Sequence, residues 1–237
     1  MNKFKVTTHL QDNYSYFYED IDPEWRRLGA IDKADNIQTL CNNLNIRSVI
    51  EIGAGDGAVL QELANRSFAK EFSALEISPS GVKAIESRNI TGLKQCSIFD
   101  GYCTAHDDKK FDLSILCHVL EHVEYPRKLI YEAIRIAKYL YIEVPCEDNI
   151  RLPTNFSFDK VGHINFYSPK TIRRLIQTCN LEIINQLTTN PSRTIYTYQK
   201  GTKGIVNFFI KQSLLARVPT LATAMFTYHS SIICKNK

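Results

Sequence analysis

The stretch that most constrains the fold of this chain runs from Val49 to Gly57, where an apolar segment ends in a glycine-rich turn with the spacing G-x-G-x-G. This pattern predicts a buried strand, a loop and then a helix, because glycines permit positive φ angles and a close approach of the backbone to a ligand. The amides at the start of the following helix favour a nucleotide-type ligand. Glu51 lies on the strand, Asp56 lies in the loop, and no Lys or Arg occurs from position 48 to 65. The loop therefore favours a cationic nucleoside over a polyphosphate.

The next apolar segment, Phe72 to Ile77, carries Glu76 near its end. Glu76 lies about twenty residues past the loop, where a carboxylate at the end of a second parallel strand can bind both ribose hydroxyls. Together, the loop and Glu76 resemble the class I S-adenosylmethionine-dependent methyltransferases. The resemblance implies S-adenosylmethionine as the cofactor, with S-adenosylhomocysteine as its product. Without the family, a strand-turn-helix connection that binds no ligand is the alternative interpretation.

Apolar segments and helix-start signals alternate along most of the chain, which predicts an α/β fold with parallel strands. The resemblance implies a Rossmann-like, seven-stranded, mostly parallel sheet in the order 3-2-1-4-5-7-6, with helices on both faces. We expect an N-terminal helical lid over residues 1–44 and a methyltransferase domain over 45–237, with an acceptor loop at 146–167 and an insertion at 188–222. Predicted strands are residues 49–52, 72–77, 93–98, 111–117, 139–144, 181–187 and 230–235, predicted helices are 25–44, 58–65, 79–85, 126–137, 169–179 and 205–217, and a hairpin is predicted over 188–200.

The resemblance extends the cofactor site to the ends of neighbouring strands and to the N-terminal segment. It places Asp100 near the exocyclic amine of adenine and Phe99 against the ring, whereas Asp-Gly at this point is also an ordinary turn. Either Arg26 or Lys33 is a candidate to pair with the cofactor carboxylate. The predicted cofactor-binding residues are Tyr14, Trp25, Arg26, Lys33, Glu51, Gly53, Ala54, Gly55, Asp56, Gly57, Glu76, Ile77, Ser78, Phe99, Asp100, Cys117 and His118.

Candidate catalytic residues follow the fourth predicted strand, because ligands lie outside the carboxyl ends of an open parallel sheet. The sequence Val-Leu-Glu-His-Val, which contains Glu121 and His122, is similar to the fourth motif of many small-molecule methyltransferases. The run Gly-His-Ile-Asn-Phe-Tyr-Ser-Pro resembles a segment of methyltransferases of glycan and small-metabolite pathways, in which the histidine faces the active site. We therefore predict His118 or His163 as the base, His122 in the same pocket, and Glu121 as the residue that orients a histidine. A lone loop histidine is otherwise more often structural.

The predicted function is methyl transfer to an oxygen or nitrogen of a small polar acceptor. Candidates are a sugar nucleotide, a capsule or surface-glycan precursor in polysaccharide biosynthesis, and another phosphorylated metabolite. An RNA or quinone-type methyltransferase and a non-catalytic cofactor-binding subunit are the alternatives, and the G-x-G-x-G spacing disfavours a nicotinamide oxidoreductase. The chain lacks the Asn/Asp/Ser-Pro-Pro-Tyr/Phe motif of enzymes that methylate amino groups of DNA and RNA bases.

Composition and charge limit the kinds of partner that we expect for this protein. The net charge is +4 and no run of Lys or Arg exceeds two, which argues against nucleic acid. Seven scattered cysteines without C-x-x-C spacing, together with the lack of an apolar signal core, predict a cytoplasmic protein. No Asp, His or Cys cluster has ligand spacing in the sequence, so no metal is predicted. The apolar segment 205–217 is expected to pack on the chain or on a second copy in a homodimer rather than on a membrane.

Overall fold

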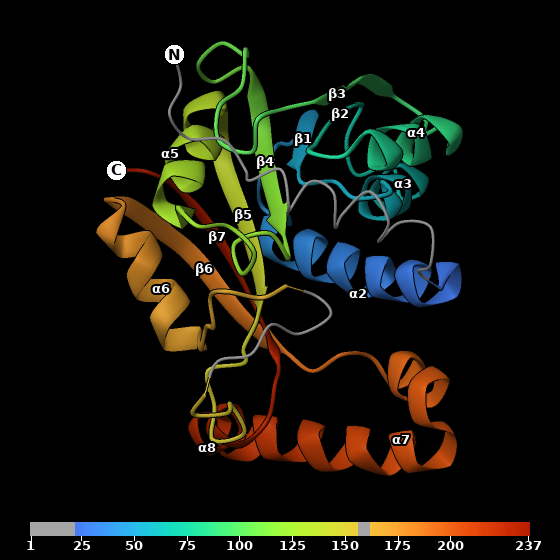
Figure 1. Ribbon diagram of the computed structural model, residues 1–237, viewed down its shortest axis with the longest axis vertical. Helices are drawn as coiled ribbons and strands as arrows, with labels where there is room; N and C mark the ends of the chain where they lie inside the picture. The colour runs from blue at the N-terminus through green and yellow to red at the C-terminus, as the bar shows by residue number, and fades with distance from the viewer. Residues whose placement is uncertain (1–21, 156–161) are drawn as a thin grey trace.

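The computed structural model describes residues 22–155 and 162–237, and in this part of the chain helices flank both faces of one seven-stranded sheet (Figure 1). The strand order is β3-β2-β1-β4-β5-β7-β6, which confirms the predicted order. Neighbouring strands among the first five pair in parallel, whereas β7 runs antiparallel to both β5 and β6. The strands are β1 (Ser48–Ile52), β2 (Glu71–Glu76), β3 (Leu93–Ile98), β4 (Phe111–Cys117), β5 (Ala137–Pro145), β6 (Leu181–Thr189) and β7 (His229–Asn236). The helices are α2 (Pro23–Cys41), α3 (Ala58–Asn65), α4 (Pro79–Ser87), α5 (Pro126–Ile136), α6 (Pro169–Thr178), α7 (Arg193–Arg217) and α8 (Pro219–Met225).

Two hydrophobic cores hold the helices to the sheet, one on each face. On one face, α5 and α6 bury apolar residues that include Leu129, Ile130 and Ile172. On the other face, α2, α3 and α4 bury a second set, which includes Ile37 and Leu60. The central strands are apolar on both faces because each face is covered by helices, as is usual for parallel sheets.

Serine caps fix the starts of two helices where the sequence predicts them. The Oγ of Ser78 accepts a hydrogen bond from the amide of Gly81 at 3.1 Å, and the Oγ of Ser168 accepts one from the amide of Thr171 at 3.3 Å. A proline follows each serine and supplies a backbone angle that already suits the first helical turn. These caps confirm the predicted starts of α4 and α6.

The hairpin predicted over residues 188–200 is wrong. Strand β6 continues to Thr189, and α7 begins soon afterwards at Arg193. Ser192 caps this helix by accepting a hydrogen bond from the amide of Ile195, while its own amide donates to Asp32 of α2 at 2.6 Å. Helix α7 is kinked at Gly201 and continues through the predicted 205–217 segment. In the described residues, no helix is both long enough and apolar enough to span a membrane.

Candidate functional site

The glycine loop joins β1 to α3 and adopts the backbone that its sequence requires. Gly53, Gly55 and Gly57 have φ angles of 74°, 60° and 78°, which side-chain-bearing residues rarely adopt. The amide of Gly53 donates to the carbonyl of Leu75 at 2.8 Å, which anchors the loop to β2. A Cβ atom at position 53 would lie 2.8 Å from Val119 Cγ2, so glycine is needed there for space as well as for conformation.

Glu76 supports the loop from the end of β2. Its Oε2 accepts a hydrogen bond from the amide of Gly55 at 2.8 Å, and its Oε1 accepts bonds from the amides of Ile77 and Ser78 at 2.9 and 3.2 Å. The side chain is buried, and Ser78 is fully buried as the cap of α4. The structure therefore shows Glu76 as the residue that fixes the shape of the loop, and its predicted contact with ribose stays a prediction.

Asp56 lies between two arginines, so the charge of this loop residue is compensated within the protein. Arg26 Nη1 of α2 is 2.7 Å from Asp56 Oδ1, and Arg88 binds Oδ2 from the other side. Although burial opposes ionisation, the two guanidinium groups hold the pKa of Asp56 below its usual value. The sequence showed no sign of this compensation, because both arginines lie outside the segment that contains the loop. Arg26 also already has a carboxylate partner.

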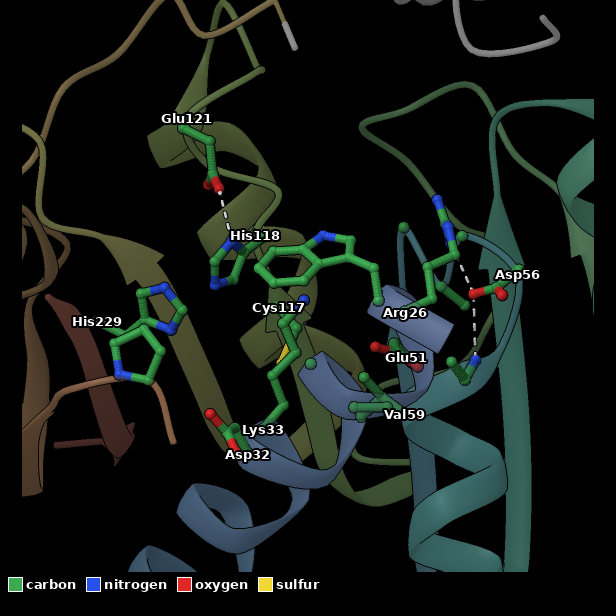
Figure 2. A pocket seen from close by; sticks show the side chains of 18 of the residues that line it. Arg26, Asp32, Lys33, Glu51, Asp56, Val59, Cys117, His118, Glu121 and His229 are labelled. Atoms are coloured by element: carbon green, nitrogen blue, oxygen red, sulfur yellow. Dashed lines mark hydrogen bonds and ion pairs between the residues drawn. The ribbon is translucent and has the colours of Figure 1, made fainter. Parts of the chain in front are cut away.

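A cavity of about 330 Å³ opens between the glycine loop, α2 and the carboxyl end of β4, within the size range of small-molecule sites (Figure 2). Predicted residues that line it are Trp25, Arg26, Lys33, Glu51, Gly53, Ala54, Gly55, Asp56, Cys117, His118, Glu121, His122 and His163. Gly57, Glu76, Ile77, Ser78, Phe99 and Asp100 are not part of the lining. Asp100 accepts hydrogen bonds from the amides of Tyr102 and Cys103, as in the ordinary turn. Tyr14 lies outside the described residues.

Glu51 and Lys33 supply opposite charges to this cavity. Glu51 is 2% exposed, and its Oε2 has no hydrogen-bond partner in the described part of the chain. Burial raises the pKa of Glu51 to about 8, with Asp56 and Glu76 adding to the effect and Lys33 opposing it. Lys33 forms no ion pair with any described residue. A buried carboxylate without a partner is costly unless a cationic group binds to it.

His118 follows β4 in a strained conformation and faces the cavity. Its φ angle is 56°, which costs a non-glycine residue about 1–3 kcal/mol and is found mainly where a side-chain orientation matters. Its Nδ1 lies 3.5 Å from Glu121 Oε1, and its Nε2 lies 3.3 Å from Glu143 Oε1. Burial and the nearby Lys33 lower the pKa of His118 to about 3, so the ring is neutral at pH 7.

Glu143 and His229 were not among the residues predicted for the site. Besides the predicted His118, His122 and His163, His229 of β7 also lines the cavity. The rings of His118 and His229 meet edge to face, with centroids 4.7 Å apart. Glu143 is fully buried on β5, and a lone glutamate in an apolar central strand was a signal that could have revealed it. His229 gave no such signal, because its position depends on the pairing of β7 with β5.

The fold also gathers groups of potential metal ligands that the spacing in the sequence did not reveal. One group is His118, Glu143 and His229, and the other is Glu121, His122 and His163. Within each group the ligand atoms lie within 4.8 Å of one another. The absence of ligand spacing along the sequence was therefore no guide to the arrangement in space.

An open sheet of this order, with a glycine loop after β1 and an acid at the end of β2, defines the fold class of the class I S-adenosylmethionine-dependent methyltransferases. The family model described as a methyltransferase domain matches residues 15–186 of the 237-residue chain. The chain belongs to this family, and it is an S-adenosylmethionine-dependent methyltransferase. No curated protein matches its sequence.

Solved structures share the fold at low sequence identity. Geranyl diphosphate C-methyltransferase from Streptomyces coelicolor A3(2), solved with S-adenosyl-L-homocysteine, gives a TM-score of 0.67 at 13% identity, with 99% of this chain and 100% of that chain covered. Coclaurine N-methyltransferase bound to N-methylheliamine gives 0.65 at 15% identity, with 99% and 84% covered. The [4+2]-cyclase SpnF gives 0.62 at 14% identity, with 86% and 80% covered. The names of these proteins give different activities, so the fold does not identify the acceptor.

The residues present fit S-adenosylmethionine. A cationic group of the cofactor can pair with the Oε2 of buried Glu51, which has no hydrogen-bond partner in the described chain. The carboxylate of the cofactor can pair with Lys33, which forms no ion pair within the described chain. The positive φ angles of the glycine loop keep this part of the backbone free of side chains, so a ligand can approach it closely.

Proposed function

We propose that this protein methylates an oxygen or nitrogen atom of a small polar acceptor that binds in the cavity beside the glycine loop. The observation that carries the proposal is that one cavity contains both the glycine loop and a histidine that lies close to two carboxylates. In Figure 2, Glu51 and Asp56 lie on one side of this cavity, and Glu121, His118 and His229 lie on the other. Two reactants held in such a space need little further ordering to react.

The chain's own residues would bind and orient the cofactor. S-adenosylmethionine supplies a methyl group that its sulfonium has already made electrophilic. Glu51 would bind the cationic end and Lys33 the carboxylate, in place of Arg26, which pairs with Asp56. The predicted contacts of Glu76 with ribose, and of Ile77, Phe99 and Asp100 with adenosine, belong to this proposal. Ser78 is left out because it is fully buried.

We propose His118 as the base that accepts the acceptor's proton, with Glu143 rather than Glu121 as the residue that orients it. The support is geometric. Glu143 Oε2 is held by hydrogen bonds from Asn36 at 2.9 Å, Tyr141 at 2.7 Å and Ser231 at 2.8 Å, so Oε1 is fixed 3.3 Å from the Nε2 of His118. Neither Nε2 of His118 nor Oε1 of Glu143 makes a hydrogen bond in the described part of the chain, so the orienting effect that we propose is electrostatic: the carboxylate favours the proton on Nε2 and leaves Nδ1 to accept one.

The charges in the cavity narrow the acceptor class. Asp32, Glu51, Asp56 and Glu121 line it, whereas Lys33 is the basic side chain of the lining that has no carboxylate partner within the described residues. A hydroxylated, uncharged group, such as a sugar, would therefore suit the cavity better than a phosphate. For a sugar nucleotide, a surface-glycan precursor or another phosphorylated metabolite, we propose that the hydroxylated part enters and the phosphate stays outside.

A screen of candidate acceptors for release of S-adenosylhomocysteine tests this function. With the correct acceptor, His118→Gln should lower kcat by about 10²–10⁴-fold. The affinity for S-adenosylmethionine, measured by calorimetry, should stay within about threefold, since we now propose His118 as the base in place of its predicted role as a cofactor contact. Unchanged turnover in His118→Gln would refute the base assignment. A response only to structured RNA or to a quinone would refute the acceptor class, and calorimetry that detects NADH but no S-adenosylmethionine would refute the function.

Three further assignments are proposals of the same kind. We propose that residues 22–44 cover the cofactor as a lid, that residues 146–155 and 162–167 contact the acceptor, and that the insertion at 188–222 serves a homodimer of a cytoplasmic protein. The rest of the predicted lid and acceptor loop, residues 1–21 and 156–161, lies outside the described residues. Support for the dimer comes from α7, where Val206, Phe209 and Ile210 expose 60%, 55% and 50% of their surface. Light scattering should show a dimer that becomes a monomer in Phe209→Glu, and a monomeric wild-type protein would refute the dimer.

A further inference from the structure

Glu121, His122 and His163 come together at the wall of the cavity from two segments that the backbone locks to each other. Glu121 and His122 follow β4, and His163 belongs to the loop after β5. The amides of Ile164 and Asn165 donate to the carbonyl of Glu121 at 2.8 and 3.0 Å. The side chain of Asn165 also donates to the carbonyls of Leu120 and Val123, at 3.0 and 2.7 Å. These bonds hold the two segments, and with them the three residues, next to each other before any ligand binds.

Glu121 presents a buried carboxylate that the protein itself does not satisfy. Its side chain is 1% exposed, and neither Oε1 nor Oε2 accepts a hydrogen bond in the described part of the chain. The Nδ1 of His118 lies 3.5 Å away, without hydrogen-bond geometry. Burying such a group is costly unless it is paired or coordinates a metal. A cationic ligand at this position would stabilise the carboxylate of Glu121.

Both histidines are oriented as metal ligands usually are. The Nδ1–H of His163 donates to Glu147 Oε2 at 2.7 Å, and the Nδ1–H of His122 donates to the carbonyl of Gly162 at 3.3 Å. Because each oxygen requires the proton on Nδ1, the nitrogen that would bind an ion is Nε2. Metal-ligating histidines characteristically donate their second ring nitrogen to a carboxylate or a carbonyl in this way.

The neighbouring group of His118, Glu143 and His229 differs in one respect that decides between the two. Glu143 Oε2 already accepts hydrogen bonds from Asn36, Tyr141 and Ser231. Its remaining oxygen, Oε1, lies 3.3 Å from His118 and 3.6 Å from His229. Internal donors thus satisfy one oxygen of Glu143, whereas neither oxygen of Glu121 accepts a hydrogen bond within the described residues. The second group serves as a matched internal control.

We propose that Glu121, His122 and His163 bind one divalent transition-metal ion, with Glu147 as a positioning residue, and that the ion binds an oxygen of the acceptor. Two imidazoles and one carboxylate with open positions suit Zn²⁺ and similar ions better than Mg²⁺. The role towards the acceptor rests on the proposed function, whereas ion binding does not. If the ion binds the acceptor, we expect the acceptor to carry a hydroxyl that can bind a metal, such as a hydroxyl of a vicinal diol.

The ion would make that hydroxyl more acidic, and the hydroxyl would lie next to the proposed base. A metal-bound hydroxyl loses its proton more readily, as metal-bound water does. The proton would pass to Nδ1 of His118, which lies beside Glu121. The acceptor oxygen then gains the bond to the methyl carbon, and the sulfur keeps the electron pair of the bond that breaks. His163, predicted as a possible base, would thus be a metal ligand instead.

Metal titration of the full-length protein after dialysis against a chelator tests the site without an acceptor. Zn²⁺ calorimetry and the visible absorption of Co²⁺ should show one ion per chain. Glu121→Gln and His163→Asn should each weaken binding by about 100-fold or more, and Glu147→Gln by about 10–100-fold, as for the loss of an outer-shell partner. His229→Asn, from the control group, should leave Zn²⁺ affinity unchanged.

Calorimetry with S-adenosylmethionine on the same samples separates the two proposals and shows that each variant is folded. Cofactor binding without stoichiometric binding of Zn²⁺ or Co²⁺ would overturn the metal site and leave the methyltransferase function standing. Loss of the ion in His229→Asn but not in His163→Asn would also overturn it, since the ion would then occupy the other group. Failure to bind S-adenosylmethionine, with Zn²⁺ still bound, would instead refute the function.

Discussion

Replacing Gly53 by alanine tests how strongly the cofactor loop requires glycine at this position. At a φ angle of 74°, an alanine carries a conformational cost of about 1–2 kcal/mol. Its Cβ would also lie 2.8 Å from Val119 Cγ2, and relieving such an overlap in a packed site costs about 1–3 kcal/mol. We therefore expect Gly53→Ala to lower the free energy of unfolding by about 2–5 kcal/mol, which corresponds to roughly 4–20 °C in Tm for a chain of this size.

Two further variants separate the two costs. At Gly201 the φ angle is 56° and nothing lies within 4 Å of an added Cβ, so Gly201→Ala should show the conformational cost alone. Val119→Ala removes the methyl groups that the new Cβ would meet. The double variant Gly53→Ala/Val119→Ala should therefore be more stable than the sum of the single effects predicts, by about 1–3 kcal/mol.

Thermal and urea unfolding followed by circular dichroism measure these energies, and calorimetry measures cofactor affinity on the folded protein. Because the loop must move to accommodate the alanine, we expect weaker binding of S-adenosylmethionine in Gly53→Ala and partial recovery in the double variant. If Gly53→Ala matched the wild type in both Tm and affinity, or if the two substitutions were simply additive, the account of this loop would be refuted.

Three further changes test individual groups. The folded-state pKa of Glu51, about 8, exceeds its ordinary value of 4.5, so the contribution of Glu51 to apo-protein stability should fall as the pH rises from 4.5 to about 8. Glu51→Gln should flatten that part of a Tm–pH profile, and an unchanged profile would contradict the burial argument. Arg88→Met removes one of the two partners of Asp56 and should lower stability by about 1–3 kcal/mol in urea unfolding, with no loss expected if Arg26 alone sufficed. Ser168→Ala should cost about 0.5–2 kcal/mol through loss of the helix cap, whereas Ser168→Asp should retain most of the stability in the same assay.

Local features of the sequence were sufficient for most of the fold. Several features depend on residues close together in the chain. They are the three positive φ angles at the glycine loop, the caps at Ser78 and Ser168, and the succession of strands and helices along the chain. The strand order itself came from the family resemblance. The hairpin error at 188–200 also has a local cause, because the cap at Ser192 was not recognised.

The arrangement of charges in the site was decided by the tertiary structure alone. Asp56 is compensated by Arg26 and Arg88, which lie 30 and 32 positions away in the sequence. His229 reaches the cavity only because β7 pairs with β5, and Glu121 meets His163 only because the loop after β5 folds back to the turn after β4. Backbone conformation follows from neighbouring residues, and the sequence therefore determined the loop and the helix starts. Charge compensation depends on distances in space, which only strand register and loop closure fix.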